Sequence, residues 1–130
     1  MTANLKILVL EDDATSLMML EELVRVVGGL IALTATSVGG ARQLIIGESP
    51  HIAILDLELP DGNGTELLAE IRARKQPISV AMLTASRDQS KIYKCGAWKP
   101  DAMFVKPLDP YEVGGWIGQQ IAHIRIRDQG

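Results

Sequence analysis

The stretch HIAILDLELPDGNG, residues 51–64, contains the pattern that decides the fold. The run from His51 to Leu55 begins with a histidine, and its other four residues are all apolar. Such a run is typical of a strand buried on both faces, as in a parallel sheet covered by helices. The run meets Asp56, and Asp61-Gly62-Asn63-Gly64 then supplies turn residues. We therefore predict a central strand that ends in a carboxylate.

Four more short apolar runs alternate with longer amphipathic segments along the chain. These runs are Leu5 to Leu10, Leu30 to Ala35, Ile78 to Leu83 and Ala102 to Val105. Helical spacing and capping residues predict helices over Thr15 to Val27, Val38 to Ile46, Thr65 to Arg74, Asp88 to Cys95, and from an N-cap at Asp109 to about Arg127. Strands that alternate with helices predict an α/β fold, here a three-layer, doubly wound (βα)5 arrangement around a parallel sheet.

The composition fits one folded domain. Of the 130 residues, 47% are apolar, so we expect a single domain over 1–130 with an ordered core from about residue 5 to 127. The net charge of −3 argues against direct binding of nucleic acid. The lone cysteine, Cys95, cannot form an internal disulfide, and the N-terminal apolar run suits neither a membrane span nor a secretory signal. We therefore expect a cytoplasmic protein without membrane contact.

Polar side chains that could carry chemistry follow four of the predicted strands. They are Glu11, Asp12 and Asp13 after the first strand, Asp56 after the third, Thr84 after the fourth and Lys106 after the fifth. Because the carboxyl ends of parallel strands share one edge of a sheet, we expect these side chains to converge. Neighbouring carboxylates repel each other unless a cation is present, and hard oxygen ligands suit Mg²⁺. An acidic nucleophile, a divalent cation, a lysine and a hydroxyl together favour phosphoryl transfer.

These motifs, in this order, resemble the receiver domain of response regulators, in particular the chemotaxis-type single-domain receivers. The resemblance covers essentially the entire chain and rests on Asp12-Asp13, on Asp56 followed by LELPDGNG, on Thr84-Ala85 and on Lys106-Pro107. It implies a flavodoxin-like sheet with strand order 2-1-3-4-5. It also implies that Asp56 accepts a phosphoryl group from a phosphohistidine of a histidine kinase or phosphotransfer protein.

The resemblance assigns a role to each remaining site residue. The protein ligands of Mg²⁺ would be Asp13 directly, Asp12 through water, Asp56, and the main-chain carbonyl of Glu58. Thr84 would hydrogen-bond the new phosphoryl group, and Lys106 would pair with it. The chain would then act as a phosphoacceptor that assists its own phosphorylation and dephosphorylation, and not as a turnover enzyme.

One position departs from the family pattern. Three residues before Lys106, where the family usually has an aromatic switch residue, this chain has Met103, with Phe104 one place later. Methionine is flexible and could still turn inward. We expect phosphorylation to switch the surface made by the last strand and the two helices that flank it in sequence, which would bind a downstream protein or a second copy of the chain. Glu58, a long acid beside the site, is expected to influence the rate of dephosphorylation.

The last third of the chain leaves two alternatives open. Four aromatic residues could pack in the core or form an exposed protein-binding face: Tyr93, Trp98, Tyr111 and Trp116. Three glycines fall inside the last predicted helix: Gly114, Gly115 and Gly118. Each costs about 1 kcal/mol relative to alanine in a helix interior. Close packing of this helix against its neighbours is the favoured interpretation, with a partner-binding face as the other.

Two further functions fit part of the pattern. A small Mg²⁺-dependent phosphohydrolase with an aspartate nucleophile uses similar groups, but it would have Asp-x-Asp after the first strand, where this chain has Glu-Asp-Asp. A binding module that keeps the pocket without being phosphorylated is the other alternative, and Met103 is the feature that favours it. Taken alone, Asp12 or Asp13 could simply cap the first helix.

Overall fold

The computed structural model describes residues 4–85 and 89–129. The main strands are β1 (Leu5–Leu10), β2 (Leu30–Ala35), β3 (Ile52–Asp56), β6 (Ser79–Thr84) and β7 (Ala102–Val105). Two short strands, β4 (Glu58–Leu59) and β5 (Gly62–Asn63), follow β3. The helices are α1 (Ala14–Val27), α2 (Val38–Glu48), α3 (Gly64–Ala73), α4 (Gln89–Gly96) and α5 (Pro110–Gln129). Asp88, the expected start of the fourth helix, lies outside the described residues.

The five main strands form one parallel sheet in the order β2-β1-β3-β6-β7. This order is the predicted 2-1-3-4-5 once the two short strands are left out of the numbering, so the predicted fold class is confirmed. All five residues of β3 are buried, as expected for the central strand. The β4 and β5 strands pair with each other in an antiparallel hairpin, which the sequence had suggested only as a turn.

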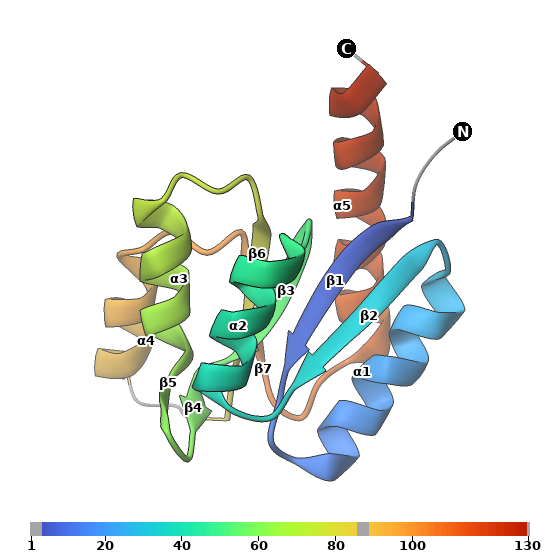
Figure 1. The fold of residues 1–130 in the computed structure, drawn as a ribbon. Coiled ribbons are helices and arrows are strands. Elements are labelled where there is room, and N and C mark those ends of the chain that lie inside the picture. Colours follow the sequence, from blue (N-terminus) through green and yellow to red (C-terminus); the bar gives the residue numbers. More distant parts are fainter. Residues whose placement is uncertain (1–3, 86–88, 130) are drawn as a thin grey trace.

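Two hydrophobic clusters lie on opposite faces of the sheet. Helices α1 and α5 cover one face, and α2, α3 and α4 cover the other (Figure 1). Figure 1 also shows that α5 extends beyond the amino ends of the strands. None of the helices in the described ranges is long and apolar enough to cross a membrane.

The glycines of α5 divide into two kinds. A Cβ at Gly114 would lie 3.1 Å from Cδ1 of Leu23 in α1, so this glycine allows the close packing that the sequence suggested. At Gly115 and Gly118 a Cβ would meet no heavy atom within 4 Å, so packing against a neighbour does not explain these two. Internal packing therefore accounts for one of the three glycines.

The aromatic residues of this region also divide. Trp116 is 8% exposed and packs edge-on against Phe104, with ring centroids 6.3 Å apart. Three other aromatic side chains are exposed: Tyr93, Trp98 and Tyr111. Core packing is therefore correct for Trp116 only, and the other three contribute to the surface.

Candidate phosphoacceptor site

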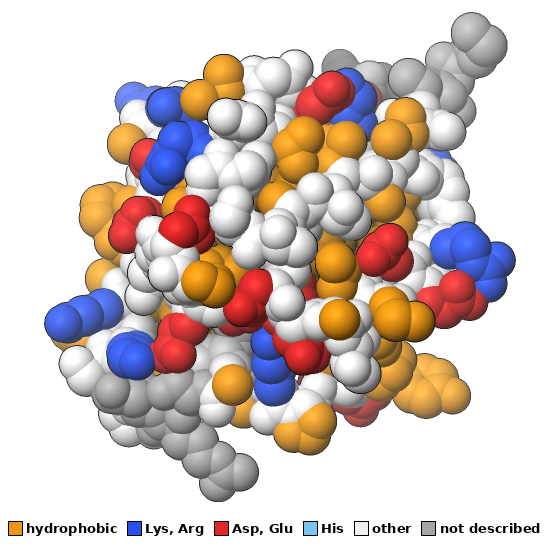
Figure 2. Space-filling model, turned by 60° about the horizontal axis from the view of Figure 1, so that its bottom comes forward, with side chains coloured by type: hydrophobic (Ala, Val, Ile, Leu, Met, Phe, Trp, Pro, Cys, Tyr) orange, Lys and Arg blue, Asp and Glu red, His pale blue; other side chains and the backbone are white. Residues whose placement is uncertain are grey.

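The polar residues predicted at the strand ends gather at the carboxyl edge of the sheet. Figure 2 turns this edge toward the viewer and shows acidic side chains around a basic one. Strand register explains the convergence, because Leu10 of β1 lies opposite Leu55 of β3, and Asp56 lies opposite Leu83 of β6. The residues that follow these positions therefore lie at one level.

Asp56 is the last residue of β3 and is only 5% exposed. One carboxylate oxygen, Oδ1, accepts a hydrogen bond from the backbone N–H of Glu58 at 3.3 Å. Gly64, the first residue of α3, packs against the Asp56 backbone so closely that a Cβ would lie 2.0 Å from its carbonyl oxygen. No side chain can be accommodated at Gly64 without moving the segment that carries the carboxylate.

Lys106 is the cation at the centre of the site. Its Nζ lies 3.1 Å from Oδ2 of Asp56 and within 2.9 Å of both carboxylate oxygens of Glu11. Burial by itself lowers the pKa of Lys106, but its hydrogen bonds to Glu11 and Asp56 outweigh this effect and raise the pKa above the ordinary value. The lysine is therefore charged and is shared between two carboxylates.

Glu11 is fully buried directly after β1. Burial raises the pKa of its carboxyl group and the neighbouring charge of Asp56 adds to this, although hydrogen bonds from Lys106 and from the Asp13 N–H partly oppose them. Oε1 accepts both of these hydrogen bonds, whereas Oε2 lies 2.8 Å from Nζ of Lys106 in an ion pair without a hydrogen bond. Both carboxylate oxygens of Glu11 are thus paired with the same lysine.

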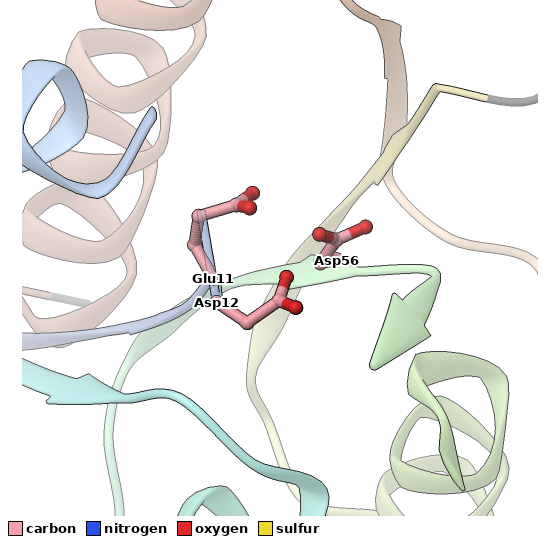
Figure 3. A group of neighbouring side chains, drawn as sticks. All are labelled: Glu11, Asp12 and Asp56. Atoms are coloured by element: carbon pink, nitrogen blue, oxygen red, sulfur yellow. The ribbon is translucent and has the colours of Figure 1, made fainter. Parts of the chain in front are cut away.

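Three carboxylates form a compact cluster at this point (Figure 3). Glu11, Asp12 and Asp56 each offer an oxygen, and these oxygens lie within 4.8 Å of one another. Asp12 is exposed, whereas the other two are buried. The set combines oxygen ligands with an opening to solvent, which suits a hard divalent cation such as Mg²⁺.

Asp13 is not brought into this cluster. It is the N-cap of α1, and its Oδ2 accepts a hydrogen bond from the Ser16 N–H at 2.9 Å. The hydrogen bonds from Ser16 lower the pKa of Asp13. The acidic pair at the site is therefore Glu11 and Asp12, one residue earlier than the pair on which the sequence prediction relied.

The sequence could have indicated Glu11 through strand register. If β1 and β3 pair so that Leu10 lies opposite Leu55, the next residues, Glu11 and Asp56, come level. Asp13 lies two residues further on, and an aspartate there is a preferred helix N-cap.

Thr84 and Glu58 lie near Asp56. Thr84 ends β6, is 1% exposed, and its carbonyl oxygen accepts a hydrogen bond from the Lys106 N–H at 2.8 Å. Glu58 begins β4 and turns its exposed carboxylate to Lys91 of α4, with an Oε1 to Nζ distance of 2.7 Å. The structure thus places both residues near Asp56, and their chemical roles stay predictions.

Met103 and Phe104 lie on opposite faces of β7. Met103 is half-buried and packs against the hydrophobic cluster on the side of α2, α3 and α4. Phe104 packs on the other side against Trp116 of α5. The residue at the aromatic switch position is thus a partly buried methionine, and its rotation on phosphorylation stays a prediction.

Comparison with known proteins agrees with this geometry. A family model described as the response regulator receiver domain matches residues 7–114, and the chain belongs to this family. It is 33% identical over 131 residues to the transcriptional regulatory protein DpiA of Escherichia coli K12, covering 98% of the chain and 55% of that protein. The chain therefore spans about half the length of this curated relative.

Solved structures share the fold. A DNA-binding response regulator of the LuxR family from Staphylococcus aureus matches with a TM-score of 0.81 and 27% identity, covering 89% of this chain and 98% of that one. A CheY-like response regulator receiver domain protein from Methanospirillum hungatei JF-1 matches with a TM-score of 0.85 and 23% identity, covering 95% and 98%. The second likeness supports the fold alone.

Proposed function

We propose that Asp56 is the phosphoacceptor of this receiver domain and that residues 1–130 act as one phosphorylation switch. The observation that carries the proposal is the position of Lys106, 3.1 Å from the carboxylate of Asp56, which forms a cluster with Glu11 and Asp12. The incoming group is a phosphoryl group on the histidine of a kinase or phosphotransfer protein. A carboxylate oxygen of Asp56 forms the new bond to phosphorus, and the phosphorus–nitrogen bond breaks with its electron pair passing to the histidine.

The chain's own residues contribute position and charge to this transfer. Lys106 loses part of its contact with Asp56 when the carboxylate becomes an acyl phosphate, and its ammonium group then pairs with a phosphoryl oxygen. The hydroxyl group of Thr84, at the end of a buried strand, donates a hydrogen bond to a second phosphoryl oxygen. Such preorganised donors stabilise charge that develops in the transition state without having to reorganise.

Mg²⁺ fits the donor set as the cofactor. Glu11, Asp12, Asp56 and the main-chain carbonyl of Glu58 would hold it, and Asp13 would serve the helix instead. A bound Mg²⁺ supplies positive charge that offsets the carboxylate repulsion and the charge on the phosphoryl oxygens. The raised pKa of Glu11, which results chiefly from its burial, and the proximity of the three carboxylates support this fit, since a bound cation would stabilise the charged form of these groups.

The domain would act through other proteins, in the cytoplasm, as a phosphoacceptor that assists its own phosphorylation and dephosphorylation. Phosphorylation replaces the single negative charge of the Asp56 carboxylate with a phosphoryl group that carries about −1.5 to −2 charges. The added charge would shift the surface made by α4, β7 and α5 between two arrangements. Exposed Tyr93, Trp98 and Tyr111 support a protein-binding role for that surface, for a downstream target or a second copy of the chain.

The direct test uses Mg²⁺ and acetyl phosphate as a small phosphodonor, with intact-mass measurement. Wild type is expected to gain one phosphoryl group and Asp56→Asn none, while chelation of Mg²⁺ with EDTA stops the reaction. Equal labelling of the two proteins would rule out Asp56 as the acceptor. Repeated release of inorganic phosphate from many donor molecules, at a rate beyond the decay of the phosphorylated protein, would support the phosphohydrolase alternative.

A further inference from the structure

The hairpin of β4 and β5 carries part of the proposed site but has little structure of its own. Each strand has two residues, and a ribbon of this size is not stable in isolation. Glu58, whose main-chain carbonyl is a proposed metal ligand, is the first residue of β4. The position of this carbonyl therefore depends on contacts that fix the hairpin to the rest of the domain.

Asp61, at the tip of the hairpin, makes such a contact with the N-terminus of α2. Its Oδ1 accepts a hydrogen bond from the Val38 N–H at 2.8 Å, and its Oδ2 accepts one from the Gly39 N–H at 3.1 Å. These partners lie 23 and 22 residues earlier in the sequence, so the carboxylate connects two distant segments. It also places a negative charge at the positive end of the helix, which is favourable.

The same helix end has a second, local cap. The Ser37 side chain accepts a hydrogen bond from the Gly40 N–H at 3.1 Å. Ser37 and Asp61 together thus satisfy the first three N–H groups of α2, which have no partner within a helix. Only Asp61 also belongs to the hairpin, so removal of each cap separates the effect on α2 from the effect on the hairpin.

We propose that Asp61 is a positioning residue that holds the β4–β5 hairpin, and with it the Glu58 carbonyl, in register for the metal by capping α2 from a distance. The inference rests on the proposed function in so far as that carbonyl is a ligand of Mg²⁺. Packing at Gly62 supports it, because a Cβ there would lie 3.3 Å from Cγ2 of Val38, so the hairpin and the helix end are in close contact around the carboxylate. The hydrogen bonds from Val38 and Gly39 also lower the pKa of Asp61, which keeps this cap ionised.

The experiment compares Asp61→Ala with Ser37→Ala, two variants that each remove one cap from the same helix end. Hydrogen exchange is followed at the Gly64 amide, which donates to the Leu57 carbonyl at 2.9 Å and closes the hairpin. We expect faster exchange there in Asp61→Ala and no change in Ser37→Ala, while amides of the first turn of α2 exchange faster in both. Protected amides of β3 verify that each variant is folded.

Calorimetric titration with Mg²⁺ provides the second readout. Loss of a residue that orients a metal ligand typically weakens metal binding by about tenfold or more, and we expect this for Asp61→Ala but not for Ser37→Ala. Asp61→Asn, which keeps an oxygen acceptor, should recover part of both losses. Unchanged Gly64 exchange in Asp61→Ala, or equal effects of the two alanine variants, would overturn the inference. A wild type that binds no Mg²⁺ would contradict the proposed function, while the exchange data would still decide whether Asp61 holds the hairpin.

Discussion

Four carboxylates at or near the site form two groups that differ in what they already bind. Glu11 and Asp56 lie at strand ends, where they share one lysine and face each other. Asp13 and Asp61 lie at helix N-termini, where backbone N–H groups satisfy them. The two groups are close in sequence, yet the pKa of Glu11 is raised, chiefly by burial, whereas hydrogen bonds lower the pKa of both Asp13 and Asp61.

This difference shows which carboxylates remain for a ligand. A carboxylate that caps a helix is stabilised by the fold, and withdrawing it to bind a metal would leave backbone donors without partners. Two buried carboxylates that lie side by side need positive charge to stabilise them, and here one lysine is shared between the two. We therefore propose that the strand-end group, together with the exposed Asp12, binds the metal and that the helix-capping group supports the fold.

The largest expected effect comes from removing the cation of the strand-end group. Lys106→Met should lower the rate of phosphorylation by acetyl phosphate by about 100-fold, because it removes a half-buried positive charge that is expected to stabilise the transferring group. Lys91→Met, which removes an exposed lysine that pairs with Glu58, is the matched control and should change the rate only a few-fold. Similar rates for both variants, measured by intact mass over time, would contradict the central role of Lys106.

The second prediction separates two adjacent aspartates. Asp12→Ala should weaken Mg²⁺ binding by about tenfold to 100-fold in calorimetric titration, because it removes a carboxylate of the cluster. Asp13→Ala should leave the affinity nearly unchanged and instead lower the urea midpoint, because α1 loses its N-cap. The opposite result, with Mg²⁺ binding lost in Asp13→Ala, would restore the assignment suggested by the sequence and refute the one based on geometry.

The third prediction concerns pH and has opposite signs for the two groups. The folded-state pKa of Glu11 lies above its ordinary value of 4.5, so the folded state binds the proton more tightly, and Glu11 lowers stability as the pH rises above that value. The folded-state pKa of Asp13 lies below its ordinary value of 3.8, so Asp13 contributes stability above that pH, which is lost as the pH falls through the folded pKa. Urea unfolding over a pH series, without Mg²⁺, should show the first trend removed in Glu11→Gln and the second in Asp13→Asn. If the stability of each variant depends on pH as that of the wild type does, the pKa shifts of Glu11 and Asp13 do not govern stability.

Much of this arrangement could be predicted from the sequence, because consecutive apolar residues and turn signals specify the order of elements. The strands, the parallel sheet and the convergence of Asp56, Thr84 and Lys106 at one edge all followed from that order. The start of α5 after Asp109 was also predictable, since an aspartate before a proline is a strong N-cap signal, and the Tyr111 N–H does donate to Asp109 at 2.9 Å.

Three consecutive acids after β1 can be separated only once the register of β1 against β3 is known, and the local pattern does not give that register. Which acid faces the pocket depends on where the strand stops and the helix starts, and a one-residue shift changes the direction of every side chain. Contacts between segments that are far apart in the sequence could not be predicted either. Nothing in PDGNG indicates that Asp61 caps a helix that starts 23 residues earlier. Likewise, the local sequence of α5 does not tell why Gly114 needs its small size, since the reason is Leu23 on another helix.

The smallest expected effect tests the periphery of the site, where Glu58 and Lys91 form an exposed ion pair between β4 and α4. Glu58→Asn should shorten the lifetime of the phosphorylated protein about two- to fivefold, because breaking this pair opens a route for water, and an exposed pair contributes at most ~1 kcal/mol. Lys91→Met breaks the same pair and should shorten the lifetime by a similar factor, and the double variant should add little to either. The decay of each phosphorylated protein is followed by intact mass after the donor is removed. Identical decay in wild type and Glu58→Asn would remove Glu58 from dephosphorylation, whereas fully additive effects would mean that the two side chains act separately and not as a pair.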